Sequence, residues 1–300
     1  MLLFILLSVI NLPARSATKV MANRHFAELG DVWKHLPLAE VLRLNPPQHY
    51  WETHAGSLCY PLTASPTRVH GALRFLKRAP LDPDLIGCAY LAALQAEAGV
   101  YPGSPALALR ELGANASYVF CDIDSASAAT LRTADTLPAV RVVEGDGIAA
   151  IAHEVERTNI EPRNVFVHID PYDPHERFSA GAMTPVELAA RLARRGYRLF
   201  YWYGYESVCE RGWALHAISC LAPGIDLWCG DVMMPAPFVF PERSGPWGCG
   251  IVLGNMTASE AAMCGRLGTA LEHISADDVV SNNEPRRLSF KVITNPLQQS

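Results

Sequence analysis

The sequence predicts a single α/β domain with a mostly parallel sheet and helices on both of its faces. The chain has 300 residues, of which 50% are hydrophobic and 18% charged, so it can bury a full core and is neither a disordered tail nor a coiled coil. Short apolar runs rich in β-branched and aromatic residues alternate with helical stretches, as expected for parallel strands joined by helices. The sequence contains no internal repeat and no low-complexity linker.

Seven short apolar runs bounded by polar or glycine-containing turns are predicted to form strands. They are residues 49–53, 118–122, 140–144, 165–170, 199–203, 225–229 and 249–253. Helices are predicted at residues 32–44, 104–112, 125–133, 147–157 and 184–195. This alternation places most of the strands parallel to one another.

Two segments depart from that alternation. Residues 61–100 are too long for a simple connection, and they predict a small helical insertion of about two extra helices, broken by Pro80 and Pro83. Residues 1–19 begin with an apolar stretch that lacks the basic residues of an export signal. An upstream start or a loose extension is therefore favoured over an export signal, and the folded domain is predicted to span residues 20–300.

Composition narrows the class of protein. The 25 basic and 30 acidic residues give a net charge of −5, which counts against a large nucleic-acid footprint held by bulk charge but not against a local basic patch. No apolar run reaches the length of a membrane-spanning helix. The eight cysteines contain no Cys-x-x-Cys pair, and His and Cys never come at metal-ligand spacing. We expect free thiols, a cytoplasmic location, no metal site and a monomer.

Acidic residues follow four successive predicted strands, at the edge where α/β proteins bind ligands. They are Glu52, Asp122, Glu144 with Asp146, and Asp170. One aspartate at a strand end is most often a helix N-cap, and Asp124 or Ser125 could serve in that role instead of Asp122. Four successive strands that each end in an acidic residue favour a binding site over helix N-caps alone.

The chemistry of these ends favours S-adenosylmethionine as cofactor. Small residues around Gly56 let a ligand approach the backbone, and an acid such as Asp122 suits a ribose diol. Asp146 and Gly147 can reach the edge of an adenine, and Asp170 can meet a reacting amine. A dinucleotide or a nucleoside triphosphate is less favoured, because neither G-x-G-x-x-G nor G-x-x-x-x-G-K-[ST] occurs.

Several blocks of sequence resemble, in the same order, the RlmJ-type 23S ribosomal RNA adenine methyltransferases. The blocks are Asp31-Val32-Trp33-Lys34-His35, Thr53-His54-Ala55-Gly56, Tyr101-Pro102-Gly103-Ser104-Pro105, Glu144-Gly145-Asp146-Gly147, Ile169-Asp170-Pro171, Trp202-Tyr203 and Gly250-Ile251-Val252. The resemblance spans about residues 22–255 and includes the helical insertion.

The resemblance implies a class I methyltransferase fold, with a Rossmann-like, seven-stranded, mostly parallel sheet and S-adenosylmethionine as methyl donor. It implies cofactor contacts at His35, His54, Gly56, Ser104, Asp122, Asp146 and Gly147. Lys34 lies in a matching block, and its charge suits the methionine carboxylate of the cofactor. Asp170 matches the catalytic acid and, with Pro171 and Tyr172, forms the predicted catalytic motif. The implied substrate is an adenine amine of 23S ribosomal RNA.

The catalytic motif departs from the family's pattern. Where the family has D-P-P-Y, this chain has Asp170-Pro171-Tyr172-Asp173. Either Tyr172 has moved forward by one position, or Asp173 has replaced the ring that stacks on adenine and is a substrate-binding acid. A base–aromatic stack contributes about 1–3 kcal/mol, so its loss would weaken base selection. Glu52 and Leu58 also stand where the family's first-strand motif has Asp and a second Gly.

Alternatives to the ribosomal RNA substrate therefore stay open. A small-molecule acceptor on the same fold is one, and a non-catalytic relative that only binds the cofactor is another. The best candidate for an RNA-binding patch is basic and lies in the insertion; its members are Arg68, Arg74, Lys77 and Arg78. A solvated helix face is the competing interpretation of these charges.

Overall fold

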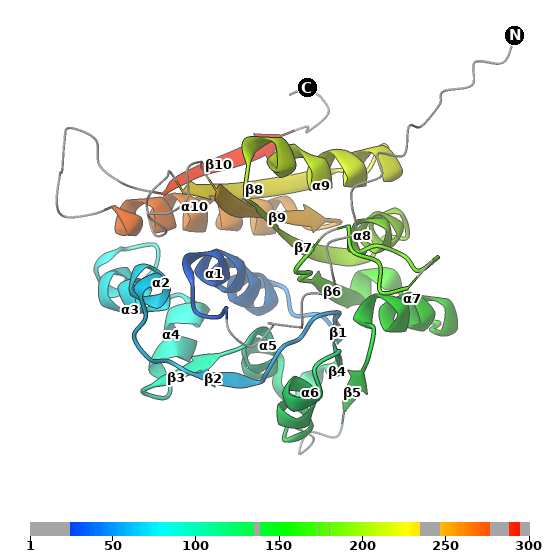
Figure 1. The fold of residues 1–300 in the computed structure, drawn as a ribbon, viewed down its shortest axis with the longest axis horizontal. Coiled ribbons are helices and arrows are strands. Elements are labelled where there is room, and N and C mark those ends of the chain that lie inside the picture. Colours follow the sequence, from blue (N-terminus) through cyan, green and yellow to red (C-terminus); the bar gives the residue numbers. More distant parts are fainter. Residues whose placement is uncertain are drawn as a thin grey trace, which may run out of the picture.

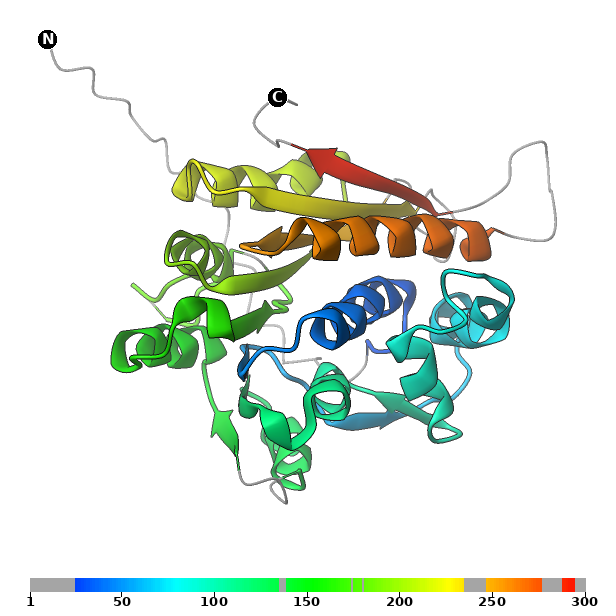
Figure 2. The same cartoon turned by 180° about the vertical axis from the view of Figure 1, so that it is seen from behind.

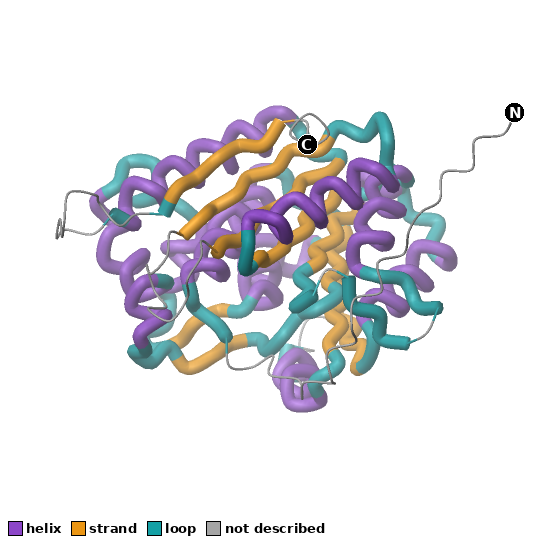
Figure 3. Tube along the Cα trace, turned by 45° about the horizontal axis from the view of Figure 1, so that its top comes forward, coloured by secondary structure: helices purple, strands orange, loops and turns teal. Residues whose placement is uncertain are grey.

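The computed structural model describes residues 25–134, 139–173, 175–179, 181–234, 247–276 and 288–294. The predicted extension, residues 1–19, lies outside the described residues. Within the described part, strands of one large sheet lie between two layers of helices (Figure 3). No described helix combines the length and the apolar character that crossing a membrane requires.

The large sheet has eight strands in the order β10-β8-β9-β7-β6-β1-β4-β5 (Figure 1). Their bounds are β1 His49–Glu52, β4 Ser117–Asp122, β5 Val140–Glu144, β6 Val165–Ile169, β7 Arg198–Tyr205, β8 Leu227–Met234, β9 Trp247–Gly254 and β10 Ser289–Thr294. The strands β5, β4, β1, β6 and β7 are parallel, whereas β9, β8 and β10 pair antiparallel. The fold is therefore α/β and its sheet is mostly parallel, as predicted.

The predicted number of seven strands in this sheet is wrong by one. Each of the seven predicted runs overlaps one of its strands, and the eighth strand is β10, which extends the edge by pairing with β8. The strand predicted at 225–229 begins instead at Leu227 and continues to Met234, because Gly230 and the buried Asp231 lie inside it rather than ending it. A Cβ at Gly230 would lie 2.8 Å from the Trp33 ring, so glycine makes room there for a core side chain.

Each face of the sheet has its own helices (Figure 2). Each face also has its own hydrophobic cluster. One layer holds α1 (Leu29–Leu44), α5 (Ser104–Leu112), α6 (Ser125–Arg132) and α10 (Ala258–Ser275). The other holds α7 (Gly147–Arg157), α8 (Pro185–Arg194) and α9 (Val208–Leu221). Local sequence sets the helix ends: α8, for example, begins at a capping box between Thr184 and Glu187, with Pro185 as its first residue.

The segment between β1 and α5 forms short elements that gather beside α1 (Figures 1 and 2). They are β2 (Cys59–Pro61), α2 (Pro66–His70), α3 (Ala72–Arg78), α4 (Ala89–Gln95) and β3 (Val100–Pro102), with a 3-10 turn at Ala79–Leu81. β2 and β3 pair antiparallel as a separate two-stranded sheet.

The chain order reverses at β1, which pairs with β4 on one side and with β6 on the other. At this switch point Glu52, the last residue of β1, lies beside Phe120 of β4 and His168 of β6. Ligands of doubly wound α/β proteins bind in the crevice at such a point, at the carboxyl ends of the strands. The fold therefore places the candidate site at the carboxyl edge of β1, β4, β5 and β6.

Candidate functional site

The predicted site residues come from different elements but meet at this carboxyl edge. His54 and Gly56 follow β1, Asp122 ends β4, Asp146 and Gly147 join β5 to α7, Asp170 follows β6, Lys34 and His35 belong to α1, and Ser104 begins α5. Direct hydrogen bonds join Gly56 to Asp122 and Lys34 to Asp170. Tyr172 and Asp173 lie in the exposed segment after Asp170.

The backbone N–H groups of the loop after β1 donate to side chains of neighbouring elements. Gly56 has a φ of +64°, and a Cβ there would lie 2.4 Å from the hydroxyl oxygen of Tyr60. The N–H of Gly56 donates to Asp122 Oδ2 at 2.7 Å, and the next two N–H groups donate to the hydroxyls of Tyr60 (2.7 Å) and Thr130 (3.0 Å). A phosphate-binding loop instead aims such groups at its ligand. The N–H groups of residues 56–58 are therefore not available as a phosphate cradle.

Asp122 directs its carboxylate at the same loop. Oδ2 accepts the N–H of Gly56, and Oδ1 accepts the N–H of Asp124 at 2.8 Å. Burial raises the pKa of Asp122, and the two backbone hydrogen bonds oppose the rise. Asp124, not Asp122, caps α6 by accepting the N–H of Ser127 at 2.8 Å. A carboxylate has about four acceptor positions, so Asp122 can still receive two ribose hydroxyls.

Asp146 and Gly147 begin α7 directly against the end of β1. Oδ1 of Asp146 caps the helix by accepting the N–H groups of Ile148 (2.9 Å) and Ala149 (3.1 Å). A Cβ at Gly147 would lie 1.8 Å from the carbonyl oxygen of Thr53, so only glycine fits at this position. Because the cap uses Oδ1, only Oδ2 of Asp146 remains for the predicted contact with an adenine edge.

Lys34 lies between two carboxylates at the end of β6. Its Nζ is 2.5 Å from Asp170 Oδ2, 3.1 Å from Asp31 Oδ1 and 5.6 Å from the centre of the Trp202 ring. Burial alone would lower the pKa of Lys34, but the carboxylates of Asp170 and Asp31 outweigh it and raise the pKa above its ordinary value. Lys34 therefore stays charged and holds Asp170, a contact that the sequence does not predict.

The two predicted histidines are held through Nδ1 and are neutral at pH 7. His35 Nδ1 lies 2.7 Å from the hydroxyl of Tyr101, and burial lowers the pKa of His35 well below its ordinary value. His54 Nδ1 lies 2.7 Å from Thr53 Oγ1, and burial lowers the pKa of His54 to about 4 although nearby carboxylates oppose the fall. Neutral imidazoles offer one donor and one acceptor each, so both rings can bind polar groups of a ligand.

A buried polar network lies beneath these residues, at the boundary of β1 and β6. Glu52 Oε1 accepts the hydroxyl of Ser104 at 2.5 Å and lies 2.8 Å from His168 Nδ1, while Oε2 accepts the hydroxyl of Tyr50 at 3.1 Å. The side chains of Glu52 and His168 are both 0% exposed. Ser104, a predicted cofactor contact, is thus bonded to Glu52. The sequence does not assign His168; its signal is a lone polar residue inside an apolar strand.

The predicted acceptor-binding residues lie in the segment after Asp170. Pro171 is buried, whereas Tyr172 is 88% exposed. Asp173 is also exposed, and its Oδ1 accepts the N–H of His175 at 2.8 Å. The ring of Tyr172, which comes one position earlier than the tyrosine of D-P-P-Y, is therefore accessible to a stacking partner. Asp173 takes part in a local turn.

The predicted RNA-binding patch is largely used inside the protein. Arg74 donates to the carbonyl oxygen of Ser275 at 2.7 Å, and Arg78 donates to that of Ala276 at 2.5 Å, both at the C-terminal end of α10. Arg68 donates to a backbone carbonyl at 3.3 Å. Three of the four predicted members thus satisfy carbonyl groups of the chain itself.

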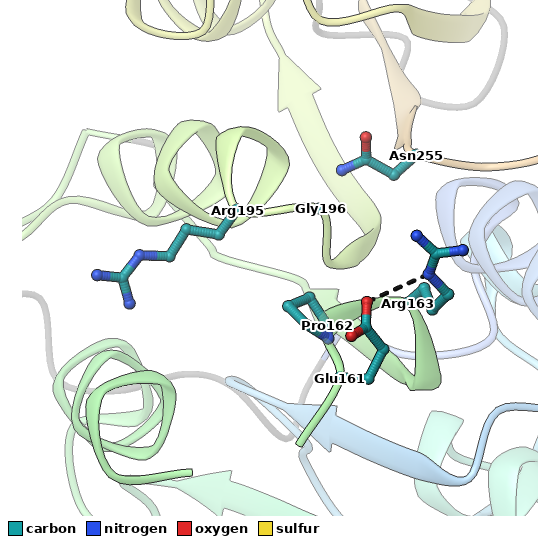
Figure 4. Close-up of a pocket in the computed structure, with 6 residues that line it drawn as sticks. All are labelled: Glu161, Pro162, Arg163, Arg195, Gly196 and Asn255. Carbon is teal, nitrogen blue, oxygen red and sulfur yellow. Dashed lines mark hydrogen bonds and ion pairs between the residues drawn. The ribbon is translucent and has the colours of Figure 1, made fainter. Parts of the chain in front are cut away.

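A pocket of about 410 Å³ lies at the opposite, amino edge of the sheet (Figure 4). It is lined by residues that precede β6 and β7 and follow β9, namely Glu161, Pro162, Arg163, Arg195, Gly196 and Asn255. Its polar side chains bond to neighbouring protein groups: Arg163 pairs with Glu161 at 3.2 Å, and Asn255 donates to the carbonyl oxygens of Ala193 and Tyr197. This pocket contains none of the predicted site residues.

One of the comparisons with known proteins supports the fold. No protein-family model and no curated protein matches the chain. Protein LPL1258 of Legionella pneumophila, described as a member of the DUF519 family, has a similar structure, with a TM-score of 0.66 and 19% identity over 90% of this chain and 98% of its own.

Two further solved structures are more distant. Fibrillarin of Aeropyrum pernix with bound S-adenosyl-L-methionine has a TM-score of 0.37 and 10% identity over 73% of this chain and 76% of its own. Precorrin-6y C5,15-methyltransferase of Geobacter metallireducens has a TM-score of 0.34 and 12% identity over 73% of this chain and 86% of its own. The likeness to the Legionella protein therefore shows the fold of the chain, and these two add nothing to it.

Proposed function

We propose that this chain is an S-adenosylmethionine-dependent methyltransferase whose cofactor site is the carboxyl edge of the sheet. The loop after β1 carries the proposal, because the N–H groups of Gly56 and its two successors are bonded internally while Asp122 keeps acceptor positions for a ribose. A cofactor with a ribose and no phosphate satisfies both conditions. A dinucleotide or a nucleoside triphosphate would need the N–H groups that this loop has already used.

The residues present fit such a cofactor. Asp122 would hold the ribose, Asp146 Oδ2 the adenine edge, and His35, whose Nε2 has no partner among the described residues, the methionine end. Gly147 lets the first turn of α7 pack directly against the end of β1. A ligand can therefore approach the backbone at this position. When bound, S-adenosylmethionine supplies an electrophilic methyl group on a sulfonium.

Asp170 is the residue that would meet the acceptor. Its Oδ2 is held by Lys34, and its Oδ1, which has no hydrogen-bond partner in the described part of the chain, would accept a hydrogen bond from the attacking amine. That bond orients the nitrogen lone pair and gives the amine proton a place to go. Correct alignment of two reactants can lower a barrier by about 7–11 kcal/mol, so a fixed Asp170 matters more than its basicity.

The acceptor that we propose first is the exocyclic amine of an adenine in 23S ribosomal RNA, as the sequence resemblance implies. Tyr172 supports it, since an aromatic ring that is 88% exposed two residues after Asp170 can stack on an unpaired base. Such a base must be unstacked or single-stranded to enter the site. A cytoplasmic monomer is part of this proposal.

A small-molecule amine is the second candidate acceptor, and the arginines of the insertion favour it. RNA affinity depends on cations that reach phosphates, but Arg74 and Arg78 are bonded to the end of α10. The net charge of −5 agrees with a smaller, uncharged acceptor.

The test is transfer of labelled methyl from S-adenosylmethionine to unmethylated, protein-free 23S ribosomal RNA, with Asp170→Ala as control. We expect incorporation that maps to an adenine, disappears in the variant and falls steeply as salt rises. Cofactor binding without incorporation into RNA would move the proposal to the small-molecule acceptor. The absence of cofactor binding by the folded wild type would contradict the methyltransferase proposal itself.

A further inference from the structure

Two buried imidazole nitrogens at the switch point have no hydrogen-bond partner among the described residues. They are Nε2 of His35, from α1, and Nε2 of His168, from β6. The two residues are 3% and 0% exposed. A buried polar atom that bonds to nothing destabilises the fold, and native proteins keep few of them, so both nitrogens need an explanation.

The hydrogen bonds of His168 determine where its proton lies. Its Nδ1 is 2.8 Å from Glu52 Oε1 and 3.1 Å from the hydroxyl oxygen of Tyr50. Tyr50 already donates its only hydroxyl proton to Glu52 Oε2. Nδ1 must therefore be the donor in both contacts and carries the hydrogen. In the neutral ring, Nε2 of His168 is then a hydrogen-bond acceptor.

The proton of His35 lies on the other ring nitrogen. Tyr90 donates its hydroxyl proton to the hydroxyl oxygen of Tyr101, whose own proton then points to His35 Nδ1 at 2.7 Å. Because burial keeps His35 neutral, the ring hydrogen must be on Nε2. Nε2 of His35 is therefore a donor.

The two rings act on the same region of the site. His168 lies 2.8 Å from Glu52, which accepts the hydroxyl of Ser104, and it precedes Asp170 by two residues. His35 follows Lys34, which is bonded to Asp170. The carboxylate of Glu52 lies against His168, which favours a cationic group on this side. A buried donor from α1 and a buried acceptor from β6 thus lie next to residues of the candidate site, and the acceptor lies beside the Glu52 carboxylate.

We propose that His168 is a further cofactor-binding residue, whose Nε2 accepts a hydrogen bond from the α-ammonium group of the methionine portion of S-adenosylmethionine. His35 Nε2 donates to the α-carboxylate of the same group. A zwitterionic amino acid offers one donor and one acceptor end, and it therefore satisfies both orphaned nitrogens at once. This inference rests on the proposed function.

The test compares two probes that differ only in the amino acid portion. S-adenosylhomocysteine carries that portion, whereas 5′-methylthioadenosine lacks it. His168→Asn keeps an N–H for Glu52 but has no atom at the position of Nε2. By titration calorimetry we expect the variant to bind S-adenosylhomocysteine about 10- to 30-fold more weakly and methylthioadenosine within about twofold of wild type.

Two variants keep the test independent of folding. His168→Gln can place an amide oxygen near the position of Nε2, so we expect it to recover most of the lost affinity for S-adenosylhomocysteine. His49→Asn changes a histidine at the opposite end of β1, where Nδ1 lies 2.6 Å from Ser117 Oγ, and should leave both affinities unchanged. An equal loss for both probes in His168→Asn, or no loss for either, would overturn the inference. A folded wild type that binds neither probe would instead overturn the proposed function.

Discussion

The two edges of the sheet both carry polar and charged side chains but use them differently. At the amino edge, the pocket of about 410 Å³ is lined by side chains that satisfy one another or the backbone, as Arg163 does with Glu161 and Asn255 with two carbonyl oxygens (Figure 4). At the carboxyl edge, His35 and His168 each bury an imidazole nitrogen that no described residue satisfies.

The difference teaches that concavity alone does not locate a binding site in this molecule, because the pocket at the amino edge is lined by polar groups that already have partners. Folding leaves a buried polar group unpaired only at a cost, so such groups persist where a ligand satisfies them. The pocket at the amino edge is concave, but a ligand there would have to break existing ion pairs. The carboxyl edge would gain hydrogen bonds when its ligand binds.

The largest expected effect comes from Asp170. Replacing it with Asn removes the charge that orients the acceptor amine, and we expect methyl transfer to fall by about 10³-fold. Binding of S-adenosylhomocysteine should stay within about threefold of wild type. At the amino edge, Glu161→Gln should change neither quantity. Single-turnover methyl transfer measures the first effect, and an Asp170→Asn enzyme of full activity would contradict the assigned role.

Gly147 tests how tightly the carboxyl edge is packed. A Cβ there would lie 1.8 Å from the Thr53 carbonyl oxygen, so Gly147→Ala should lower the free energy of unfolding by about 3 kcal/mol. Gly196 at the amino edge has a φ of +84° but open space around it, with the nearest atom 3.9 Å away. Gly196→Ala should therefore cost only about 1 kcal/mol. Urea unfolding compares the two, and equal losses would contradict the packing argument.

Lys34 tests the difference between a buried and an exposed ion pair. Lys34→Gln leaves Asp31 and Asp170 without their counter-charge, and we expect a loss of about 2 kcal/mol in unfolding free energy at pH 7. The carboxylates then bind protons more readily in the folded chain than in the unfolded chain, so the loss shrinks as the pH falls. Arg163→Gln, in an exposed pair, should cost less than about 1 kcal/mol and show no such recovery. Urea titrations at pH 7 and pH 5 measure this difference. An equal loss of unfolding free energy in Lys34→Gln at both pH values would contradict it.

The last expected effect is on the pH dependence of stability. The pKa of folded His54 is about 4, below its ordinary value of 6.5, so the unfolded chain binds the proton first as the pH falls. Stability is therefore lost between about pH 6.5 and pH 4, and His54→Gln should remove up to about 1.4 kcal/mol per pH unit of that slope. His49→Gln should remove less, because partial burial lowers the pKa of His49 more modestly. An unchanged slope in His54→Gln would contradict a ring that stays neutral in the folded chain.

Most of the sheet can be predicted from the sequence because strands are set by local apolar patterns. The acidic ends of β1, β4 and β6 follow from the same patterns, and so does their meeting at one edge. β10 could not be placed in this way, since its sequence, Ser289–Thr294, mixes polar and apolar residues and is not a continuous apolar run. The Lys34–Asp170 pair joins α1 to the end of β6 across 136 residues, so only the packing of the helix on the sheet reveals it. His168 escaped prediction because its neighbours in the sequence are apolar and its partners come from β1.

The most direct test of the account is the affinity for S-adenosylhomocysteine of the wild type and of one variant from each edge. Asp122→Ala removes the carboxylate that we assign to the ribose, and Arg195→Ala changes the pocket at the amino edge. Calorimetry should show one micromolar site in the wild type, at least 10-fold weaker binding in Asp122→Ala and no change in Arg195→Ala. Undetectable binding to the folded wild type, or a loss confined to Arg195→Ala, would contradict the assignment of the carboxyl edge as the cofactor site.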